Sequence, residues 1–232
     1  MYRLLLFFFL FRRIGCTILG NSEVVRLEHR LNQIILRGSL HSLPRFSHEN
    51  HGLRFFRFSL EVPRLSGTVD ILPVISEESL LMEADLSEGT MLTVSGQVRT
   101  HNIRSDGKRH LLIFVFASAI VCEDGEPINN VILEGPVCRE PTYRRTPLGR
   151  EICDVMLAVP RAFRRADYLP CILWGRTALE ASRCHTSDIL QIRGRLQSRL
   201  YTKVTEEGTS QRTAYEISAL SAEAIRLTEH QF

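Results

Sequence analysis

The chain has 232 residues, 44% of them apolar and 24% charged, which is the composition of an ordinary folded protein with room for two cores of roughly 100 residues each. That balance excludes a disordered chain and a fibrous one. The formal net charge of +3 divides unevenly, as +2 for residues 1–29, −2 for residues 30–128 and +3 for residues 129–232, so only the C-terminal part favours a polyanionic partner.

The N-terminal segment begins with an apolar run, residues 4–11, followed by Arg12 and Arg13. The run is too short to span a bilayer and lacks the longer apolar region and small-residue cleavage site of a signal peptide. We predict that residues 1–29 are an extension outside the fold. The six cysteines show no C-x-x-C spacing, which indicates reduced thiols in a cytoplasmic protein without a membrane association.

The remaining sequence repeats itself. Matching residues recur with an offset of 97 positions, as in these pairs: Asn32 and Asn129, Gly38 and Gly135, Leu60 and Leu157, Asp70 and Asp167. The offset becomes 98 for Gly96 and Gly194, as if the second copy had gained one residue in a loop before its last hairpin. A period near one hundred residues suits a compact domain. We predict domains at residues 30–121 and 129–232, joined by an acidic linker at 122–128.

In chain order, each copy shows the same pattern of alternating strands and one helix. The first copy predicts strands at 34–40, 55–62, 72–75, 91–100 and 110–121, with a helix capped by Ser76 within 76–88 and a turn at Asp106-Gly107. The second copy predicts strands at 131–138, 152–159, 168–174, 188–204 and 213–226, with a helix near 178–184 and a turn at Glu207-Gly208.

Five strands with a helix between the third and the fourth is the order of the OB-fold, a small barrel whose outer face and loops bind oligonucleotides. We therefore expect an all-β protein of two tandem five-stranded OB-fold barrels, each with a short helix between strands 3 and 4.

The stretch 188–201, DILQIRGRLQSRLY, is the most basic strand of the chain. Alternation predicts one face with Leu190, Ile192, Leu196 and Leu200, and an opposite face with Gln191, Arg193, Arg195, Gln197, Arg199 and Tyr201. Guanidinium groups beside an aromatic ring suit phosphate contacts and base stacking. The alternative is an ordinary solvated face, and a GC-rich genome, which encodes arginine in place of lysine, would also explain why only Lys108 and Lys203 are lysines.

Two large aromatics, Tyr168 and Trp174, lie six residues apart and therefore share a face of the third strand of the second copy. Such residues are commonly core, but Trp174 corresponds to Glu77 in the first copy, which a shared packing role does not tolerate. The aromatic and basic set therefore indicates a function that the second copy has and the first lacks. Acidic residues around the first helix predict that the first barrel is structural or binds a partner.

Four motifs of the second copy, in order and at suitable spacing, carry a resemblance to a known family. They are GPVCREPTYRRTPLG (135–149), DVMLAVPR (154–161), YLPCILWGRTA (168–178) and GRLQSRLY (194–201). Together they resemble the bacterial single-stranded-DNA-binding protein family. The resemblance covers about residues 129–227, and residues 32–120 only through the internal repeat.

The resemblance implies roles for several residues. Tyr168, Trp174 and Tyr201 fall where the family places base-stacking aromatics, and Arg161, Arg176, Arg195 and Arg199 fall in or near its basic groove. The chain departs from the family at residues 227–232, which follow the barrel without the family's Gly/Gln/Pro-rich tail and acidic tip. The usual route of partner recruitment is therefore not expected. Since the family commonly assembles four barrels, the resemblance implies a homodimer forming a four-barrel pseudo-tetramer.

The sequence therefore predicts a bacterial protein that binds single-stranded DNA with little sequence preference, in replication, recombination or repair. Tyr168, Trp174 and Tyr201 would stack on bases, and six arginines would bind phosphates: Arg145, Arg161, Arg176, Arg193, Arg195 and Arg199. The alternative is a protein-interaction subunit of a primosome-like replication-restart assembly. No phosphate-binding glycine loop, catalytic carboxylate pair or metal-ligand cluster is present, so neither an enzyme nor a cofactor or metal site is predicted.

Overall fold

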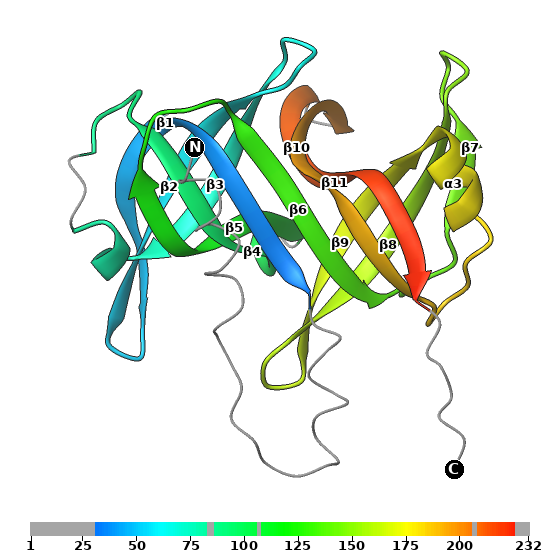
Figure 1. Cartoon of the computed structure of the whole chain (residues 1–232), viewed down its shortest axis with the longest axis horizontal. Helices are drawn as coiled ribbons and strands as arrows, with labels where there is room; N and C mark the ends of the chain where they lie inside the picture. Colours follow the sequence, from blue (N-terminus) through cyan, green and yellow to red (C-terminus); the bar gives the residue numbers. More distant parts are fainter. Residues whose placement is uncertain (1–30, 83–85, 106–107, 206–207, 226–232) are drawn as a thin grey trace, which may run out of the picture.

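The computed structural model describes residues 31–82, 86–105, 108–205 and 208–225 (Figure 1). Five of the predicted features lie wholly or partly outside these ranges. They are the extension at 1–29, part of the first helix, the turn at Asp106-Gly107, the turn at Glu207-Gly208 and the residues after 225.

The first copy folds into a closed barrel. Its elements are β1 (Asn32–Asn50), β2 (Leu53–Pro63), β3 (Val69–Glu77), the 3-10 helix η2 (Glu78–Leu80), β4 (Met91–Ser105) and β5 (Lys108–Cys122). The sheet runs in the order β2-β3-β5-β4-β1, and an additional pairing between β2 and β1 closes it. The five predicted strands are all present, each longer than the alternating pattern alone indicated.

The second copy forms a barrel of the same order. Its elements are β6 (Ile128–Pro136), β7 (Thr142–Arg145), β8 (Glu151–Arg161), β9 (Arg165–Trp174), α3 (Gly175–Ala181), β10 (Ile189–Thr205) and β11 (Gly208–Ile225). Here β6 and β7 together correspond to the single strand β1. The chain leaves the sheet between them, and a bridge between Val137 and Leu157 holds the barrel closed. The fold is therefore all-β, as predicted, with two OB-fold barrels in tandem.

The two cores repeat side chain for side chain. Four leucines fill the first barrel at 36, 60, 72 and 92, and their counterparts fill the second at 133, 157, 169 and 190; all eight are at most 2% exposed. Since alternate side chains of a strand point to opposite faces, each strand buries one set and leaves the other for the surface. The outer faces are thus free to differ between the copies.

The helix predictions are partly wrong. In the first barrel, Ser76 does not cap a helix, because β3 continues through Glu77 and buries the Ser76 side chain; one 3-10 turn, η2, follows. In the second barrel, α3 starts and ends earlier than predicted, because Gly175 leaves β9 at a φ of 54° and turns directly into the helix. Within the described ranges, neither helix has the length and apolar character needed to cross a membrane.

The predicted extra residue of the second copy is confirmed by the strand registers. Glu77 pairs with Phe55 and Trp174 with Ile152, which keeps the offset of 97. Leu92 pairs with Gly38 and Leu190 with Gly135, which gives an offset of 98. The additional residue therefore lies between β9 and β10, in the segment that forms α3.

The two barrels are joined edge to edge by an antiparallel pairing of β1 with β6, which cross the centre of the molecule side by side (Figure 1). Ile34 pairs with its own counterpart Val131, and Asn32–Leu133 mirrors Leu36–Asn129. The pairing therefore has an internal two-fold symmetry, whose axis passes between Ile34 and Val131. One sheet of eleven strands results, and it runs through both barrels.

Two buried aspartates add a second, reciprocal connection. Asp70 of the first barrel accepts hydrogen bonds from the backbone N–H and hydroxyl of Ser198 in the second barrel, at 2.6 and 2.8 Å. Asp167 of the second barrel accepts the equivalent pair from Thr100 in the first, at 2.6 and 3.1 Å. The beginning of β3 and the beginning of β9 therefore each contact the opposite barrel.

Candidate nucleic-acid interface

The outer face of β9 carries the two predicted aromatics. Leu169, Cys171 and Leu173 point into the core, so Tyr168 and Trp174 point outward, with exposed fractions of 50% and 36%. The indole N–H of Trp174 donates to the Ser218 hydroxyl of β11 at 3.1 Å, which fixes the ring orientation while leaving part of the ring accessible.

The faces of β10 match the predicted alternation only in part. Leu190, Ile192 and Leu196 are buried, as predicted. Leu200 is 69% exposed, because β10 there has left the barrel and pairs with β11 alone. Gln197 is buried, because it donates to Glu216 at 2.9 Å and its neighbour Ser198 is held by the first barrel. Both departures arise from tertiary packing.

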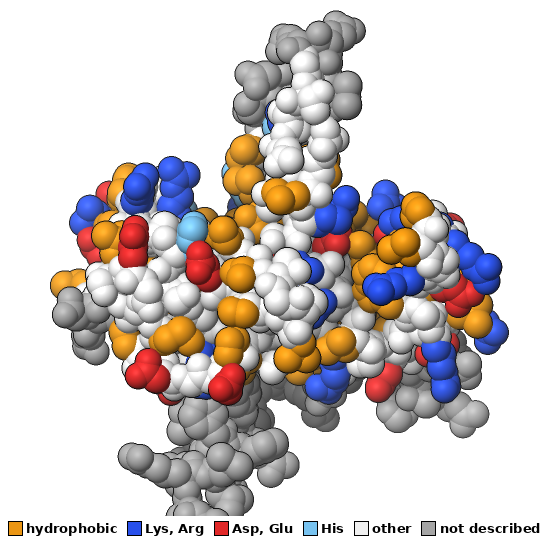
Figure 2. All heavy atoms as spheres, turned by 90° about the horizontal axis from the view of Figure 1, so that it is seen from above, with side chains coloured by type: hydrophobic (Ala, Val, Ile, Leu, Met, Phe, Trp, Pro, Cys, Tyr) orange, Lys and Arg blue, Asp and Glu red, His pale blue; other side chains and the backbone are white. Residues whose placement is uncertain are grey.

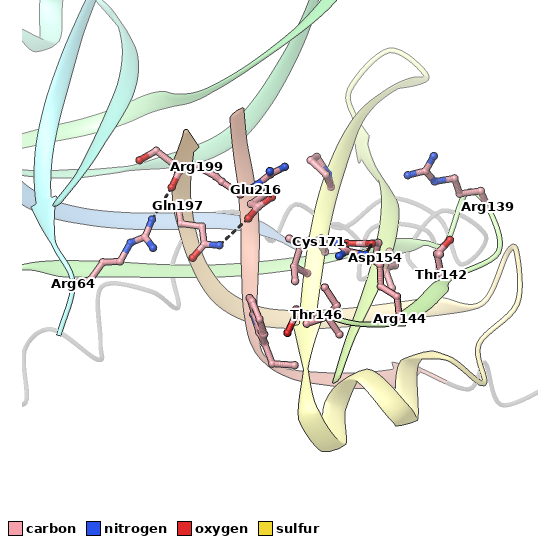
Figure 3. A pocket seen from close by; sticks show the side chains of 16 residues that line it. Arg64, Arg139, Thr142, Arg144, Thr146, Asp154, Cys171, Gln197, Arg199 and Glu216 are labelled. Carbon is pink, nitrogen blue, oxygen red and sulfur yellow. Dashed lines mark hydrogen bonds and ion pairs between the residues drawn. The ribbon is translucent and has the colours of Figure 1, made fainter. Parts of the chain in front are cut away.

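A hollow of about 680 Å³ opens on this side of the second barrel (Figure 3). Its lining comes from several strands and includes Trp174, Gln197, Arg199 and Glu216. The first barrel contributes Arg64, which extends from the turn after β2 toward β10 (Figure 3). The outer surface formed by Trp174, Arg195, Gln197, Arg199, Glu216 and Ser218 is called the second-barrel face below.

Several exposed arginines of the second barrel are paired with carboxylates. Arg145 on β7 contacts Glu151 at 3.2 Å, Arg176 on α3 contacts Glu180 at 2.8 Å, and Arg199 on β10 contacts Glu216 at 3.5 Å. The Arg145 and Arg176 pairs are exposed and worth at most about 1 kcal/mol each, so an arriving phosphate can compete for these two guanidinium groups. The carboxylate of Glu216 beside Arg199 is buried.

Two arginines of β10 have no ion pair among the described residues. Arg193 is exposed at a bulge and contacts Gln191 at 3.4 Å. Arg195 lies opposite Ser218, half-buried, and its Nε has no hydrogen-bond partner there. Arg195 thus places unsatisfied donors one strand away from Trp174.

Tyr201 lies further along β10, beyond the barrel, and is 38% exposed. The guanidinium carbon of Arg199 is 6.0 Å from its ring centroid, at the limit of a cation–π contact. The three predicted aromatics are therefore all at the surface, although Tyr201 lies on the projecting hairpin and the other two on the barrel wall.

Arg161 is not on the second-barrel face. Its guanidinium lies 3.3 Å from Asp167, the carboxylate that binds Thr100 of the first barrel. Asp167 thus connects Arg161 to Thr100, the residue that follows Arg99 on β4. Burial, together with the positive charge of Arg161, lowers the pKa of Arg99. Arg161 therefore faces the first barrel, as Arg64 faces the second.

Two exposed aromatics of the second barrel were not predicted, Phe163 and, on β7, Tyr143, which is 39% exposed. Phe163 lies in the turn between β8 and β9, at a positive φ of 60°, and is 94% exposed. The residues around it are RAFRRAD, and an aromatic within such an arginine run is itself a sequence signal for stacking beside phosphate. Figure 2 shows basic side chains distributed around the second barrel, on the right, with acidic ones along one edge of the first.

No group of side chains suited to a metal ion occurs among the described residues. Cys184, next to His185 in sequence, has a free thiol, and burial raises its pKa. A raised thiol pKa makes Cys184 a poor nucleophile at neutral pH.

The fold and the face define a class, that of tandem OB-fold proteins with an aromatic and arginine-lined outer surface. The model of the single-strand binding protein family matches residues 128–225. Single-stranded DNA-binding protein B of Bacillus subtilis is 36% identical over 89 residues, which are 35% of this chain and 77% of that protein. This chain belongs to the single-strand binding protein family.

Other relatives extend the comparison. The single-stranded DNA-binding protein of Bacillus cereus is 32% identical over 109 residues, 44% of this chain but only 61% of that protein. The chain thus spans about three fifths of that relative's length. The crystal structure of the wild-type single-stranded DNA-binding protein of Thermus aquaticus superimposes with a TM-score of 0.72 at 25% identity, covering 88% of this chain and 97% of that one. Coverage of that extent includes both barrels.

Proposed function

We propose that this protein binds single-stranded DNA with little sequence preference, through base stacking and arginine–phosphate contacts on the second barrel. The observation that carries the proposal is the exposed ring of Trp174, held by Ser218 and lying beside Arg195 and Arg199 at a hollow in the barrel surface. Membership of the single-strand binding protein family and the similarity to single-stranded DNA-binding proteins support the same ligand.

Stacking supplies most of the expected affinity. A base on an aromatic ring contributes about 1–3 kcal/mol and is tolerant of sequence, because every base has a π-face. Tyr168, Trp174, Tyr201 and Phe163 offer four exposed rings on one barrel. Since several neighbouring arginines already contact carboxylates, the electrostatic share is moderate, and stacking compensates for it.

Arg145, Arg176, Arg193, Arg195 and Arg199 would contact the phosphates. Arg161 would bind a phosphate only where the strand passes between the barrels, because its guanidinium points to the first barrel. A protein that protects single strands in this way would act in DNA replication, recombination or repair.

The direct test is the fluorescence of Trp174, which is the only tryptophan in the sequence. Addition of oligo-dT should quench its emission, and the affinity should fall as salt rises, because phosphate contacts release counterions. Unchanged emission at micromolar oligonucleotide would contradict the proposal.

The matched variants separate stacking from general surface effects. Trp174→Ala with Tyr201→Ala removes two rings, so we expect DNA affinity in a filter-retention assay to fall at least about tenfold. Leu220→Ala, which removes an exposed apolar side chain of β11, should leave affinity unchanged. Retention that survives the double substitution would favour a protein-interaction role instead.

We also propose that two chains assemble into a homodimer with four barrels. Two barrels already share one sheet through β1 and β6, so a second chain would supply the other two. Light scattering at micromolar protein should give twice the mass of one chain, and a monomer mass would exclude this assembly.

A further inference from the structure

The hollow on the second-barrel face contains a buried polar pair. Gln197 of β10 and Glu216 of β11 are each 6% exposed, and the Nε2 of Gln197 donates to the Oε1 of Glu216 at 2.9 Å. Both side chains line the hollow, and Figure 3 shows them next to Arg199. Burial of a carboxylate costs free energy unless its oxygens accept enough hydrogen bonds. The contacts of Glu216 therefore decide what this pair can bind.

The OB-fold itself does not require a carboxylate at the position of Glu216. The long hairpin of each barrel has a bulge, and directly after it Gly96 of β4 and Gly194 of β10 are equivalent. From these glycines onward the two ladders keep the same register, so Glu216 takes the place of Phe114 of β5. Because an aromatic ring serves the first barrel at this position, the buried carboxylate is particular to the second.

The arginines around the hollow leave Glu216 without a close ion pair. The charged side chains that line it are Arg64, Arg139, Arg144, Arg199, Asp154 and Glu216. Arg64 already donates twice to a carboxylate of its own barrel, and Arg144 donates twice to Asp154. Among the described residues, the shortest ion-pair contact of Glu216 is the 3.5 Å between its Oε2 and the Nε of Arg199.

The carboxylate of Glu216 thus has unused capacity to accept hydrogen bonds. An ionised carboxylate can accept about four, whereas Glu216 has the amide of Gln197 and the long contact with Arg199. The side chain of Arg199 is 57% exposed, so its guanidinium can donate into the hollow. The site therefore offers acceptors from Glu216 directly beside donors from Arg199.

The four bases differ in how well they fit acceptors beside donors. An unpaired base presents its Watson–Crick edge, where guanine has the acceptor O6 next to two donors, N1–H and the N2 amine. Thymine has a single donor between two acceptors. Adenine and cytosine each have one amine next to an acceptor nitrogen. Guanine alone has two adjacent donors for the carboxylate and a neighbouring acceptor for the guanidinium.

We propose that the hollow recognises one guanine base of the bound single strand, with Glu216 accepting from N1–H and the N2 amine while Arg199 donates to O6. The inference rests on the proposed function, which brings the strand to the second-barrel face. The remaining N–H groups of Arg199 stay free for a phosphate. Stacking and phosphate contacts elsewhere on the barrel do not distinguish bases, so the preference concerns one base among those covered.

Guanine substitution in a thymine strand tests the site with the wild-type protein. The parent is the shortest oligo-dT that saturates the quenching of Trp174, and guanine replaces one thymine at each position in turn. Competition against fluorescently labelled oligo-dT, measured by anisotropy, should show an affinity about tenfold higher at one position. Hypoxanthine there, which lacks the N2 amine, should lose most of the gain, and adenine and cytosine should give none.

A substitution assigns the preference to its residue. Glu216→Gln replaces one acceptor oxygen by a donor amide, so the ratio of the affinities for the guanine and thymine strands should fall to about one. The ratio is the readout because loss of a negative charge changes the attraction of all phosphates together. Glu223→Gln, an exposed change on the same strand β11, is the matched control and should keep the wild-type ratio.

The outcomes separate this inference from the proposed function. If the wild type binds neither strand, the proposed function fails. If it binds thymine strands but gains nothing from guanine at any position, or if Glu216→Gln keeps the wild-type ratio, the guanine site is wrong and the proposed function stands. Thermal unfolding shows whether each variant is folded. The comparison of guanine with hypoxanthine needs no variant and decides the question even where Glu216→Gln does not fold.

Discussion

The two buried aspartates between the barrels are equivalent in position but not in their contacts. Asp70 receives two hydrogen bonds from Arg64, at 2.7 and 2.5 Å, in addition to the two from Ser198. Asp167 receives one longer contact from Arg161, at 3.3 Å, and its Oδ2 is buried without a partner among the described residues. Charge-assisted bidentate pairs are the stronger kind, so Asp70 contributes more to the connection.

Asp70→Asn should therefore destabilise the protein more than Asp167→Asn. Removing one partner of a buried ion pair leaves the other charge uncompensated, and we expect a loss of about 3 kcal/mol for Asp70→Asn. The loss for Asp167→Asn should be smaller, since fewer contacts depend on its charge. Urea unfolding of both variants measures the difference, and equal losses would contradict this ranking.

The same contacts predict an acid dependence of stability. Burial alone would raise the pKa of Asp70, but hydrogen bonds from Arg64 and Ser198 outweigh it and hold the pKa below its usual value. A carboxylate with a lowered pKa in the folded state stabilises the fold above the unfolded pKa of about 3.9, and this contribution is lost as the pH falls through the folded value. Unfolding free energies measured from pH 7 to pH 2 should fall less in Asp70→Asn than in the wild type.

At the scale of elements, one asparagine side chain in each barrel extends the hydrogen bonding between two strands, β1 with β4 in the first barrel and β6 with β10 in the second. The Asn32 side chain accepts from the Val98 N–H at 2.9 Å and donates to the Val98 carbonyl at 2.8 Å. Asn129 does the same with Leu196, at 2.9 and 2.7 Å. In each case the side chain takes the place of backbone pairing where the strands diverge, because β1 and β6 turn to pair with each other.

Asn32→Ala and Asn129→Ala should therefore destabilise by similar amounts. Each leaves a buried backbone N–H and carbonyl unpaired, which costs about 1–3 kcal/mol per group. Urea unfolding is the measurement, with Asn130→Ala, an exposed neighbour on β6, as the control. A neutral result for either variant would mean that water replaces the side chain.

Strands were predictable from sequence because their alternation is a local property, and the repeat gave each one an independent second example. The first helix was predicted incorrectly. The spacing of Leu80 and Leu81 is typical of a helix, but it does not show that β3 continues through Ser76 and leaves only one 3-10 turn after it. The end of α3 likewise depends on where β9 stops. These boundaries are set by packing against the barrel.

The candidate site shows the same division. The exposure of Tyr168 and Trp174 follows from their parity on one strand, and the comparison between copies pointed to it. The burial of Gln197 and the position of Arg161 depend on how the two barrels pack against each other. A local sequence pattern does not contain that information.

At the scale of the whole molecule, the internal two-fold symmetry makes each barrel complete the other. Arg64 extends from the first barrel to the second-barrel face, and Arg161 from the second to the first. The second-barrel hollow is therefore lined by arginines from both barrels. The connection between barrels consequently matters for binding as well as for stability.

This arrangement predicts that the linker is dispensable for holding the barrels together. Asp124, Gly125 and Glu126 lie exposed between β5 and β6, outside every strand pairing. A protease site inserted there and cleaved should leave both halves associated. The β1–β6 ladder and the two aspartate contacts do not involve the linker, so cleavage leaves them intact.

Size-exclusion chromatography of the cleaved protein should show both fragments in one peak at the uncleaved volume. The same cleavage in a chain carrying Asp70→Asn and Asp167→Asn should release fragments at lower urea, because only the ladder then joins the barrels. Separation of the wild-type halves at micromolar concentration would mean that the covalent linker, rather than the shared sheet, sets the relative position of the two barrels.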